Sequence, residues 1–526
     1  MRKSPITRRR LLAAGFVGTA AAAALAGCGE TQIVEKEVVK VVTQEVPVER
    51  VVTQIVEKAK VVEKEVPVEV QKVVTQIVEK ETIVEKEKIV EKVVTAAPMA
   101  PKAVTIEVSF PANNPANIDY IKNTVNARFM AANPHITVES ETVPWGEWSP
   151  KLRTRLAADE APDVFLNDEI IMPGYVARGA ILALDEFAKR DAEQIANVPM
   201  LDRGMDNRTG KRYGLSRNAI GTAMTYNARM LEEAGIEPAP LNSPWTWDEY
   251  LENVRVLTFD TSGRHPGDAG FDLDNVEQWG AYLRDNWVTQ IVPTVYQNDG
   301  EIIDAQARNS TFNLAETEAG LKWRNDLMYV HMVAPDPDET AAIESGGYHA
   351  PLINGRAAMY EHLLGQESHW PDPASLDFEI GSMVGLSGTR PSNSFFSHQM
   401  HVAKSSAHPE EAWMYMVFQV TDEQSALEIY TKADYGLPAN TKLWTPSALG
   451  ARSQYPTSID PWLHELDQGW MNGLGTNVAW VEWYVAWRAE YQESSFNRRP
   501  ISESVVKMQE ESQKVLDRVF KDLQLE

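Results

Sequence analysis

Cys28 is the only cysteine in the chain, and its surroundings indicate a specific chemistry for its thiol. It follows Leu25, Ala26 and Gly27, a spacing that matches the bacterial lipobox, in which the cysteine is acylated and becomes the mature N-terminus. A secreted protein of this size normally has paired cysteines or none, so a lone cysteine here favours a lipid attachment point. We therefore predict a lipid anchor on Cys28 and exclude disulfides and cysteine-based metal clusters.

Histidines and catalytic motifs give little support for an enzyme. His398 and His401 are three residues apart in an expected strand, where side chains at that spacing point to opposite faces, so joint metal binding is not expected. The sequence has no His-Glu-x-x-His, no Gly-x-Ser-x-Gly and no phosphate loop. A glycosidase built on two carboxylates needs no local signature and stays open as an alternative. We predict a binding protein with no enzymatic activity, no cofactor and no metal.

Aromatic side chains offer another chemistry, because a flat indole ring can stack on an apolar ligand face. The chain has 15 Trp and 16 Tyr. A sugar presents such a face bordered by hydroxyls, which carboxylates and amides can hydrogen-bond. Trp145 directly follows an expected strand and is a candidate stacking platform.

The N-terminus predicts export. Residues 8–10 are arginines and are followed by small and apolar residues through Ala26, a stretch too short and too rich in Ala and Gly for a membrane span. Paired arginines before leucines resemble a twin-arginine export signal, and the general export route is the alternative. The 50 basic and 75 acidic residues give a formal charge of -25, which argues against nucleic acid as a partner.

Residues 31–95 consist almost entirely of Val, Glu, Lys, Thr and Gln in an imperfect repeat without aromatic residues or glycine. Such a composition cannot build a globular core, and Pro47 and Pro67 interrupt any continuous helix. We predict a signal peptide at 1–27 and a stalk at 28–101. An extended chain, a fragmented helix and a coiled coil all stay open for the stalk.

From about Lys102 the pattern alternates between strands and helices. Strands are expected at 104–108, 136–139 and 163–166, and helices at 118–131, 148–158 and 501–525. This alternation predicts an α/β fold with a parallel sheet. Because about 425 residues exceed what one core usually supports, we expect two lobes with a ligand cleft between them.

Six sequence blocks occur in one consistent order along this domain. They include Ala-Pro-Asp-Val at 161–164, Thr-Tyr-Asn at 225–227, Thr-Trp-Asp-Glu at 246–249 and Gly-Arg-Ala-Ala-Met at 355–359, followed by blocks at 408–413 and 435–438. Together they resemble the family 1 extracellular solute-binding proteins, which contain maltose-binding and related sugar receptors. Arg356 replaces the family's usual lysine. Thr225 stands where the family usually has an apolar strand residue, and residues 362–394 follow no family block, so Thr225 and residues 362–394 could line the cleft.

The resemblance implies a two-lobed periplasmic-binding-protein-like fold for the solute-binding domain at 102–526. Strands would cross between the lobes near 216–224 and again near 394–403. The expected bounds are 102–219 with 398–445 for lobe 1 and 220–397 with 446–526 for lobe 2. The lobes would close around a solute, and a membrane permease would recognise the closed form.

The resemblance also places candidate ligand contacts. Asn167 and Asp168 follow the third strand, and Asn218 lies on the first crossing strand. Trp287 and Tyr296 fall where the second lobe in this family often offers an aromatic residue.

Further candidates come from later blocks. Tyr360 and Glu361 directly follow the Ala-Ala-Met block, and His398 could reach the cleft because the chain crosses between the lobes there. A late aromatic segment resembles the block that supplies a stacking residue in maltose-binding relatives. Within it, Trp480 near the expected helix start is the preferred platform.

The sequence therefore predicts an extracytoplasmic protein anchored to the cell membrane through lipid on Cys28. It would capture a mono- or oligosaccharide and deliver it to the permease subunits of an ABC importer. A non-sugar solute such as a polyamine, a short peptide or a phosphodiester stays open, because an acidic surface also suits a cation. A stalked sensor that feeds a signalling receptor is a further alternative.

Overall fold

The structure is a computed structural model that describes residues 102–112, 115–198, 203–285, 287–364, 375–433, 436–449 and 458–525. The predicted signal peptide, Cys28 and the predicted stalk lie outside the described residues. In the part described, no helix has both the length and the apolar character needed to cross a bilayer.

The first sheet has five strands in the order β2-β1-β3-β13-β6. β1 pairs in parallel with β2 and β3, whereas β13 runs antiparallel to β3 and β6. The three parallel strands therefore end at the same edge of the sheet. Their bounds are β1 Val104–Pro111, β2 Ile136–Val143, β3 Val164–Asp168, β6 Leu215–Ser216 and β13 His398–Val402.

The second sheet follows the order β15-β12-β7-β10-β9-β8, and β11 and β14 also pair with β7. β7 is the long central strand and β10 runs antiparallel to it. The bounds are β7 Asn218–Asn227, β8 Phe259–Asp260, β9 Val276–Tyr282, β10 Ala357–Leu363, β11 Ile380–Met383, β12 Asn393–Phe396, β14 Leu437–Pro438 and β15 Met471–Asn472. A separate two-stranded ribbon pairs β4 Met205–Asp206 with β5 Lys211–Arg212.

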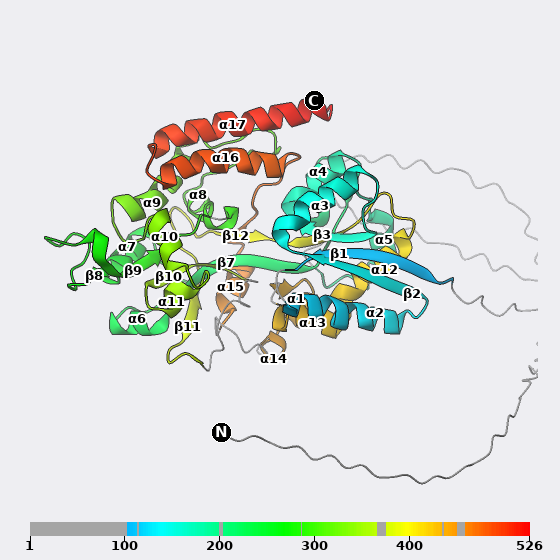
Figure 1. The fold of residues 1–526 in the computed structure, drawn as a ribbon, viewed down its shortest axis with the longest axis horizontal. Helices are drawn as coiled ribbons and strands as arrows, with labels where there is room; N and C mark the ends of the chain where they lie inside the picture. The colour runs from blue at the N-terminus through cyan, green and yellow to red at the C-terminus, as the bar shows by residue number, and fades with distance from the viewer. Residues whose placement is uncertain are drawn as a thin grey trace, which may run out of the picture. The chain divides into compact units, whose positions relative to one another are not determined.

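The chain crosses between the two sheets within both predicted stretches. β6 of the first sheet runs into β7 of the second at Arg217, and β12 runs into β13 at Ser397. β12 and β7 are antiparallel partners, with Phe396 opposite Ile220. The two crossings thus lie side by side at the middle of the molecule (Figure 1). The residue bounds of the lobes stay a prediction.

Helices cover both faces of the first sheet (Figure 1). Phe129, Trp413 and Met416 belong to the core on one face, and Trp148 and Tyr175 belong to the core on the other. The helices are α1 Pro115–Asp119, α2 Ala127–Ala132, α3 Trp145–Ala157, α4 Met172–Ala177, α5 Asp185–Arg190, α12 Pro409–Thr421 and α13 Glu423–Thr431. A π-helical segment, Tyr120–Asn126, joins α1 to α2.

The second sheet has its own helices, and the antiparallel pair α16 and α17 packs beside α8 and α9 (Figure 1). The bounds are α6 Ala228–Glu233, α7 Trp247–Val256, α8 Pro293–Gln297, α9 Ala315–Tyr329, α10 Pro337–Ile343, α11 Ala350–Ile353, α15 Asp460–Gln468, α16 Trp480–Ser495 and α17 Ile501–Asp522. The short helix α14 Pro446–Leu449 packs against α13, and Leu449 belongs to the core of the first sheet. Thr246 and Glu249 form the capping box of α7, as the block at 246–249 predicts.

Glu465 of α15 is a buried carboxyl group that ties this helix to β12. It accepts hydrogen bonds from the backbone N–H of Gly385 and from Nδ2 of Asn393, the latter at 3.2 Å. Burial raises the pKa of Glu465 from 4.5 to about 8, and the nearby Glu361 adds to this effect. The folded protein therefore keeps Glu465 protonated at pH values where the unfolded chain has lost this proton.

We predict a pH-dependent stability that the Glu465→Gln substitution removes. The folded pKa lies above the unfolded one, so the stability from Glu465 is present below about pH 4.5 and is lost as the pH rises towards 8. Between pH 5 and pH 8 the free energy of unfolding of the wild type should fall by at least about 1 kcal/mol more than that of Glu465→Gln. Denaturant unfolding at both pH values measures this difference, and equal pH dependence in the two proteins would contradict the assignment.

Candidate functional site

Asp168, His398 and Asn218 come together where the second crossing strand enters the first sheet. Nε2 of His398 lies 3.2 Å from Oδ1 of Asp168, and Nδ1 lies 2.9 Å from Nδ2 of Asn218. Oδ1 of Asn218 accepts the backbone N–H of His398 at 2.9 Å, which turns the amide so that Nδ2 donates to the ring. With Nδ1 as the acceptor, the neutral ring carries its proton on Nε2 and donates it to Asp168.

Trp145 lies against the ring of His398. It is the first residue of α3 and is partly exposed, and the two ring centroids are 5.2 Å apart with 34° between the planes. An indole next to a carboxylate and an imidazole can contact the apolar face and the hydroxyl edge of one ligand. Trp145, Asp168, Asn218 and His398 form what we call the crossing group.

Asn167 turns away from this group. Its Nδ2 donates to the hydroxyl of Tyr175 at 2.8 Å, and its Oδ1 accepts the backbone N–H of Asp168 at 2.9 Å. Successive residues of a strand point to opposite faces, so Asn167 faces α4 while Asp168 faces His398. In this structure Asn167 holds the end of β3 against α4.

Aromatic rings of the second lobe form a second group. The ring of Trp480, the first residue of α16, stacks on Tyr484 at 5.0 Å and 14°. Trp287 lies 5.5 Å from Trp480 and 5.3 Å from Tyr484, between centroids. Trp480 is buried and Trp287 is partly exposed. We call Trp287, Trp480 and Tyr484 the aromatic group.

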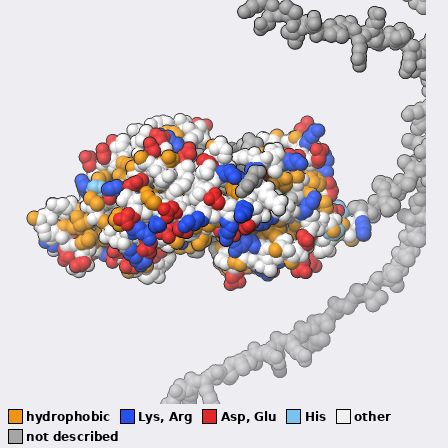
Figure 2. Space-filling view, turned by 90° about the horizontal axis from the view of Figure 1, so that it is seen from above, with side chains coloured by type: hydrophobic (Ala, Val, Ile, Leu, Met, Phe, Trp, Pro, Cys, Tyr) orange, Lys and Arg blue, Asp and Glu red, His pale blue; other side chains and the backbone are white. Residues whose placement is uncertain are grey.

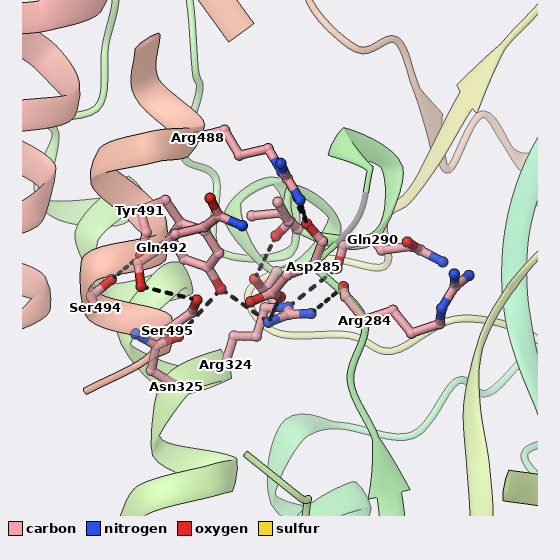
Figure 3. Close-up of polar contacts among 12 residues, drawn as sticks. Arg284, Asp285, Gln290, Arg324, Asn325, Arg488, Tyr491, Gln492, Ser494 and Ser495 are labelled. Carbon is pink, nitrogen blue, oxygen red and sulfur yellow. Dashed lines mark hydrogen bonds and ion pairs between the residues drawn. The ribbon is translucent and has the colours of Figure 1, made fainter. Parts of the chain in front are cut away.

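A buried ion network joins α9, α16 and the loop that follows β9 (Figure 3). Arg324 of α9 is 2% exposed and lies 2.7 Å from a carboxylate oxygen of Asp285, in the loop that follows β9. It also donates to the hydroxyl of Tyr491 on α16 at 3.0 Å, while Arg488 of α16 donates to the backbone oxygen of Asp285 at 2.8 Å. A buried cation without partners would be costly, so this network strongly holds the loop after β9 against α16.

Tyr360 and Glu361 lie inside the second lobe. Tyr360 is 2% exposed, packs near Tyr282 and bonds the ring of His349 at 2.5 Å. Glu361 points to the other face of β10 and lines a small cavity that also contacts Arg324. Burial raises the pKa of Glu361 to about 7, although Arg324 opposes the shift. The structure does not bring these two residues to the crossing group or the aromatic group.

A cavity of about 590 Å³ opens between elements of the two sheets. Its wall combines Glu169, Pro173 and the segment 203–208, near the first sheet, with the segments 300–307 and 472–478, near the second. Tyr296 is the one predicted contact residue on this wall. A volume of this size is in the range of small-molecule sites in proteins.

Glu169 links this cavity to the crossing at Ser397. Its carboxylate lies 2.5 Å from Nη1 of Arg203 and accepts the hydroxyl of Ser397 at 2.7 Å. Burial raises the pKa of Glu169, and the Arg203 guanidinium opposes that shift. Asp168 and Glu169 are neighbours in sequence. The carboxylate of Asp168 belongs to the crossing group, and that of Glu169 lines the cavity.

The sequence analysis missed Glu169, Arg203 and the segment 300–307. The sequence could have indicated Glu169 as a site residue, because it directly follows Asp168 at the end of a strand. Arg390, which also lines the cavity, falls in the stretch 362–394 that follows no family block and that we expected to contribute to the cleft. The segment 300–307 had no sequence signal.

His401 serves the fold of the first lobe. Its Nδ1 lies 2.9 Å from the backbone oxygen of Tyr213, and burial lowers the pKa of the ring to about 4. In the part of the chain that the structure describes, no three His, Cys, Asp or Glu side chains are grouped to hold a metal ion.

The two lobes touch beside the cavity, at α4 and the residues before α16. Nη1 of Arg178 donates to the backbone oxygens of Gly174 at 2.9 Å and Val478 at 3.3 Å. A Cβ on Gly174 would lie 2.9 Å from the Val478 oxygen, closer than real Cβ contacts. Glycine is therefore required for this approach.

The family model for bacterial extracellular solute-binding proteins matches residues 113–426. The chain belongs to this family. This membership confirms the sequence prediction of a solute-binding protein, and members of the family are binding proteins rather than enzymes.

Solved structures of similar fold include an ABC substrate-binding protein of Listeria monocytogenes in complex with cycloalternan. It has a TM-score of 0.63 and 19% identity, over 80% of this chain and 100% of that one. The sugar-binding protein MalE of Xanthomonas citri has a TM-score of 0.63 and 17% identity, over 80% and 100% of the two chains. These likenesses confirm the predicted two-lobed α/β fold of this solute-binding protein.

Curated relatives match over shorter stretches. A binding protein of Brucella abortus (strain 2308) is 35% identical over 130 residues, which cover 24% of this chain and 29% of that protein. The arabinooligosaccharide-binding protein of Halalkalibacterium halodurans is 23% identical over 224 residues, 39% of this chain and 45% of that protein. This solute-binding protein thus matches less than half the length of both relatives.

We predict that Gly174→Ala lowers stability relative to Gly146→Ala. Both glycines lie in helices, so both variants gain the same helix propensity, about 1 kcal/mol. The added methyl group at Gly174 meets the Val478 oxygen, whereas Gly146 has open space around it. Overpacking of this kind typically costs about 1–3 kcal/mol. Denaturant unfolding measures the difference, and equal stability of the two variants would contradict the close contact.

Proposed function

We propose that this protein captures a carbohydrate between its lobes and passes it to the permease subunits of an ABC importer. The signal at 1–27 would export it, and lipid on Cys28 would hold it at the outer side of the cell membrane. The stalk at 28–101 would connect the anchor to the binding domain.

One observation carries the sugar assignment. Trp145 in the first lobe and Trp287 in the second are partly exposed aromatic rings. Beside Trp145 lie the imidazole of His398 and the carboxylate of Asp168, and Glu169 adds a carboxylate on the cavity wall. Stacking rings with planar polar groups at their edges suit a sugar. The cycloalternan and arabinooligosaccharide named for the two relatives support the same class of ligand.

A ligand panel tests this proposal. We expect maltotriose, mannotriose or arabinotriose to raise the melting temperature of the purified protein, because a ligand that binds only the folded state stabilises it. Spermidine, a short peptide and glycerophosphodiesters serve as the competing classes. Stabilisation by one of those and by no sugar would replace the sugar assignment.

Trp287→Ala should weaken binding of the stabilising sugar by roughly tenfold or more, since aromatic anchors dominate binding energy. Phe259→Ala is the matched control, because Phe259 lies on β8 at the far edge of the second sheet. Calorimetry gives both affinities. If the two variants bind the sugar equally well, the aromatic group is not part of the site.

Cys28→Ser should move the protein from the membrane fraction to the soluble fraction of the producing cells, while sugar affinity stays unchanged. The substitution removes the thiol that would carry the lipid. Immunoblots of the fractions measure the distribution. A variant that stays in the membrane fraction would show that another feature anchors the chain.

A further inference from the structure

Each arginine on the cavity wall already has a carboxylate partner. Arg203 lies 2.5 Å from Glu169, and Arg208 lies 3.0 Å from Asp206. Arg390 lies 2.9 Å from Asp299. Figure 2 likewise shows acidic and basic side chains intermixed across the middle of the face that it draws. The positive charge of each of these arginines is therefore already balanced by a carboxylate.

The wall also carries surplus negative charge. Glu301 and Asp304 line the cavity in addition to the paired carboxylates, and its described lining contains no lysine. Hydrogen bonds from the backbone of Arg308 and Asn309 outweigh burial and lower the pKa of Asp304, so it stays ionised. The charge of Glu301 acts on the nearby Tyr296, whose pKa is raised first by burial and then by this carboxylate. An anion that entered the cavity would meet net repulsion.

Asn477 adds a hydrogen-bond donor to this wall. The residue is 1% exposed and lies on the cavity lining, three positions before Trp480. Its Oδ1 accepts the backbone N–H of Ala479 at 2.9 Å, which fixes the orientation of the amide. Nδ2 has no hydrogen-bond partner among the described residues. A buried donor without a partner is costly, so an acceptor is expected to meet it.

From these observations we infer that the cavity binds an uncharged sugar unit, that Asn477 Nδ2 donates to one of its oxygens, and that acidic sugars are rejected. This inference rests on the proposed function and narrows it to neutral saccharides. A neutral hydroxyl or ring oxygen satisfies the donor without breaking an ion pair. A uronate carboxylate would add a further negative charge to a wall whose arginines are already balanced by carboxylates.

The first test compares neutral trisaccharides with trigalacturonate on the full-length protein. By calorimetry we expect one of maltotriose, mannotriose and arabinotriose to bind at least about a hundredfold more tightly than trigalacturonate, since polar groups left unpaired penalise the wrong ligand strongly. Equal or tighter binding of trigalacturonate would overturn the inference while leaving sugar binding intact. If no saccharide binds, the proposed function itself fails.

The second test uses Asn477→Asp, which keeps the oxygen that accepts from Ala479 and removes the donor. The melting temperature without ligand should fall, because a carboxylate at this buried position lies among other acidic groups, while the bond from Ala479 is kept. Affinity for the neutral trisaccharide should fall by about tenfold or more, as buried polar groups set such discrimination. Unchanged affinity in a folded variant would show that Asn477 is not the donor.

The third test uses Glu301→Gln, an exposed position whose substitution leaves the arginine pairs intact. The preference for the neutral trisaccharide over trigalacturonate should shrink by about threefold or more at low salt, because one repelling charge is gone. The matched control is Glu318→Gln, on α9 and outside the cavity lining. A preference that changes equally in both variants would exclude the cavity charge as its cause.

Discussion

The hydrogen bonds between Asn218 and His398 are the interaction on which the rest of this structure depends. Asn218 begins β7 and His398 begins β13, so the pair joins the two strands at the point where each leaves one sheet for the other. Asp168 extends the pair to the end of β3. The residues that link the lobes are thus also residues that we propose as ligand contacts, and any hinge motion must pass through them.

Apolar residues around the Asn218–His398 pair also pack the two lobes together. Ile170 of the first lobe and Phe396 of β12 belong to one apolar cluster with Trp480, so the crossings share a core with the aromatic group. On one flank Gly174 allows α4 to approach Val478, and on the other Ser397 holds Glu169 beside the cavity. In the second lobe the buried Arg324 network holds the loop after β9 against α16. If the proposed contact residues bind a ligand, this fixed packing lowers the entropic cost of binding.

The sequence predicted the elements near the N-terminus of the domain well, because alternation and periodicity are local signals. It also indicated each member of the crossing group as a separate candidate, since Trp145 and Asp168 follow strands and Asn218 and His398 lie at expected crossings, and the fold shows that the four residues lie together. Tyr360 and Glu361 were candidates because they directly follow the Ala-Ala-Met block. Closeness to that block in the sequence does not reveal that the folded protein buries both faces of β10. The cavity wall depends on loops that meet only in three dimensions, so Arg203 and the segment 300–307 could not be located from spacing.

The central claim is that the two lobes, joined at the Asn218–His398 pair, close on a neutral sugar. Cys28 is the only cysteine, so a Cys28→Ser background accepts spin labels at two chosen sites without interference. Labels at Glu193→Cys in the first lobe and Glu316→Cys in the second occupy exposed positions. Double electron–electron resonance should show a shorter and narrower distance distribution when the stabilising trisaccharide is added. A sugar that binds by calorimetry yet leaves this distribution unchanged would contradict closure of the lobes on the ligand.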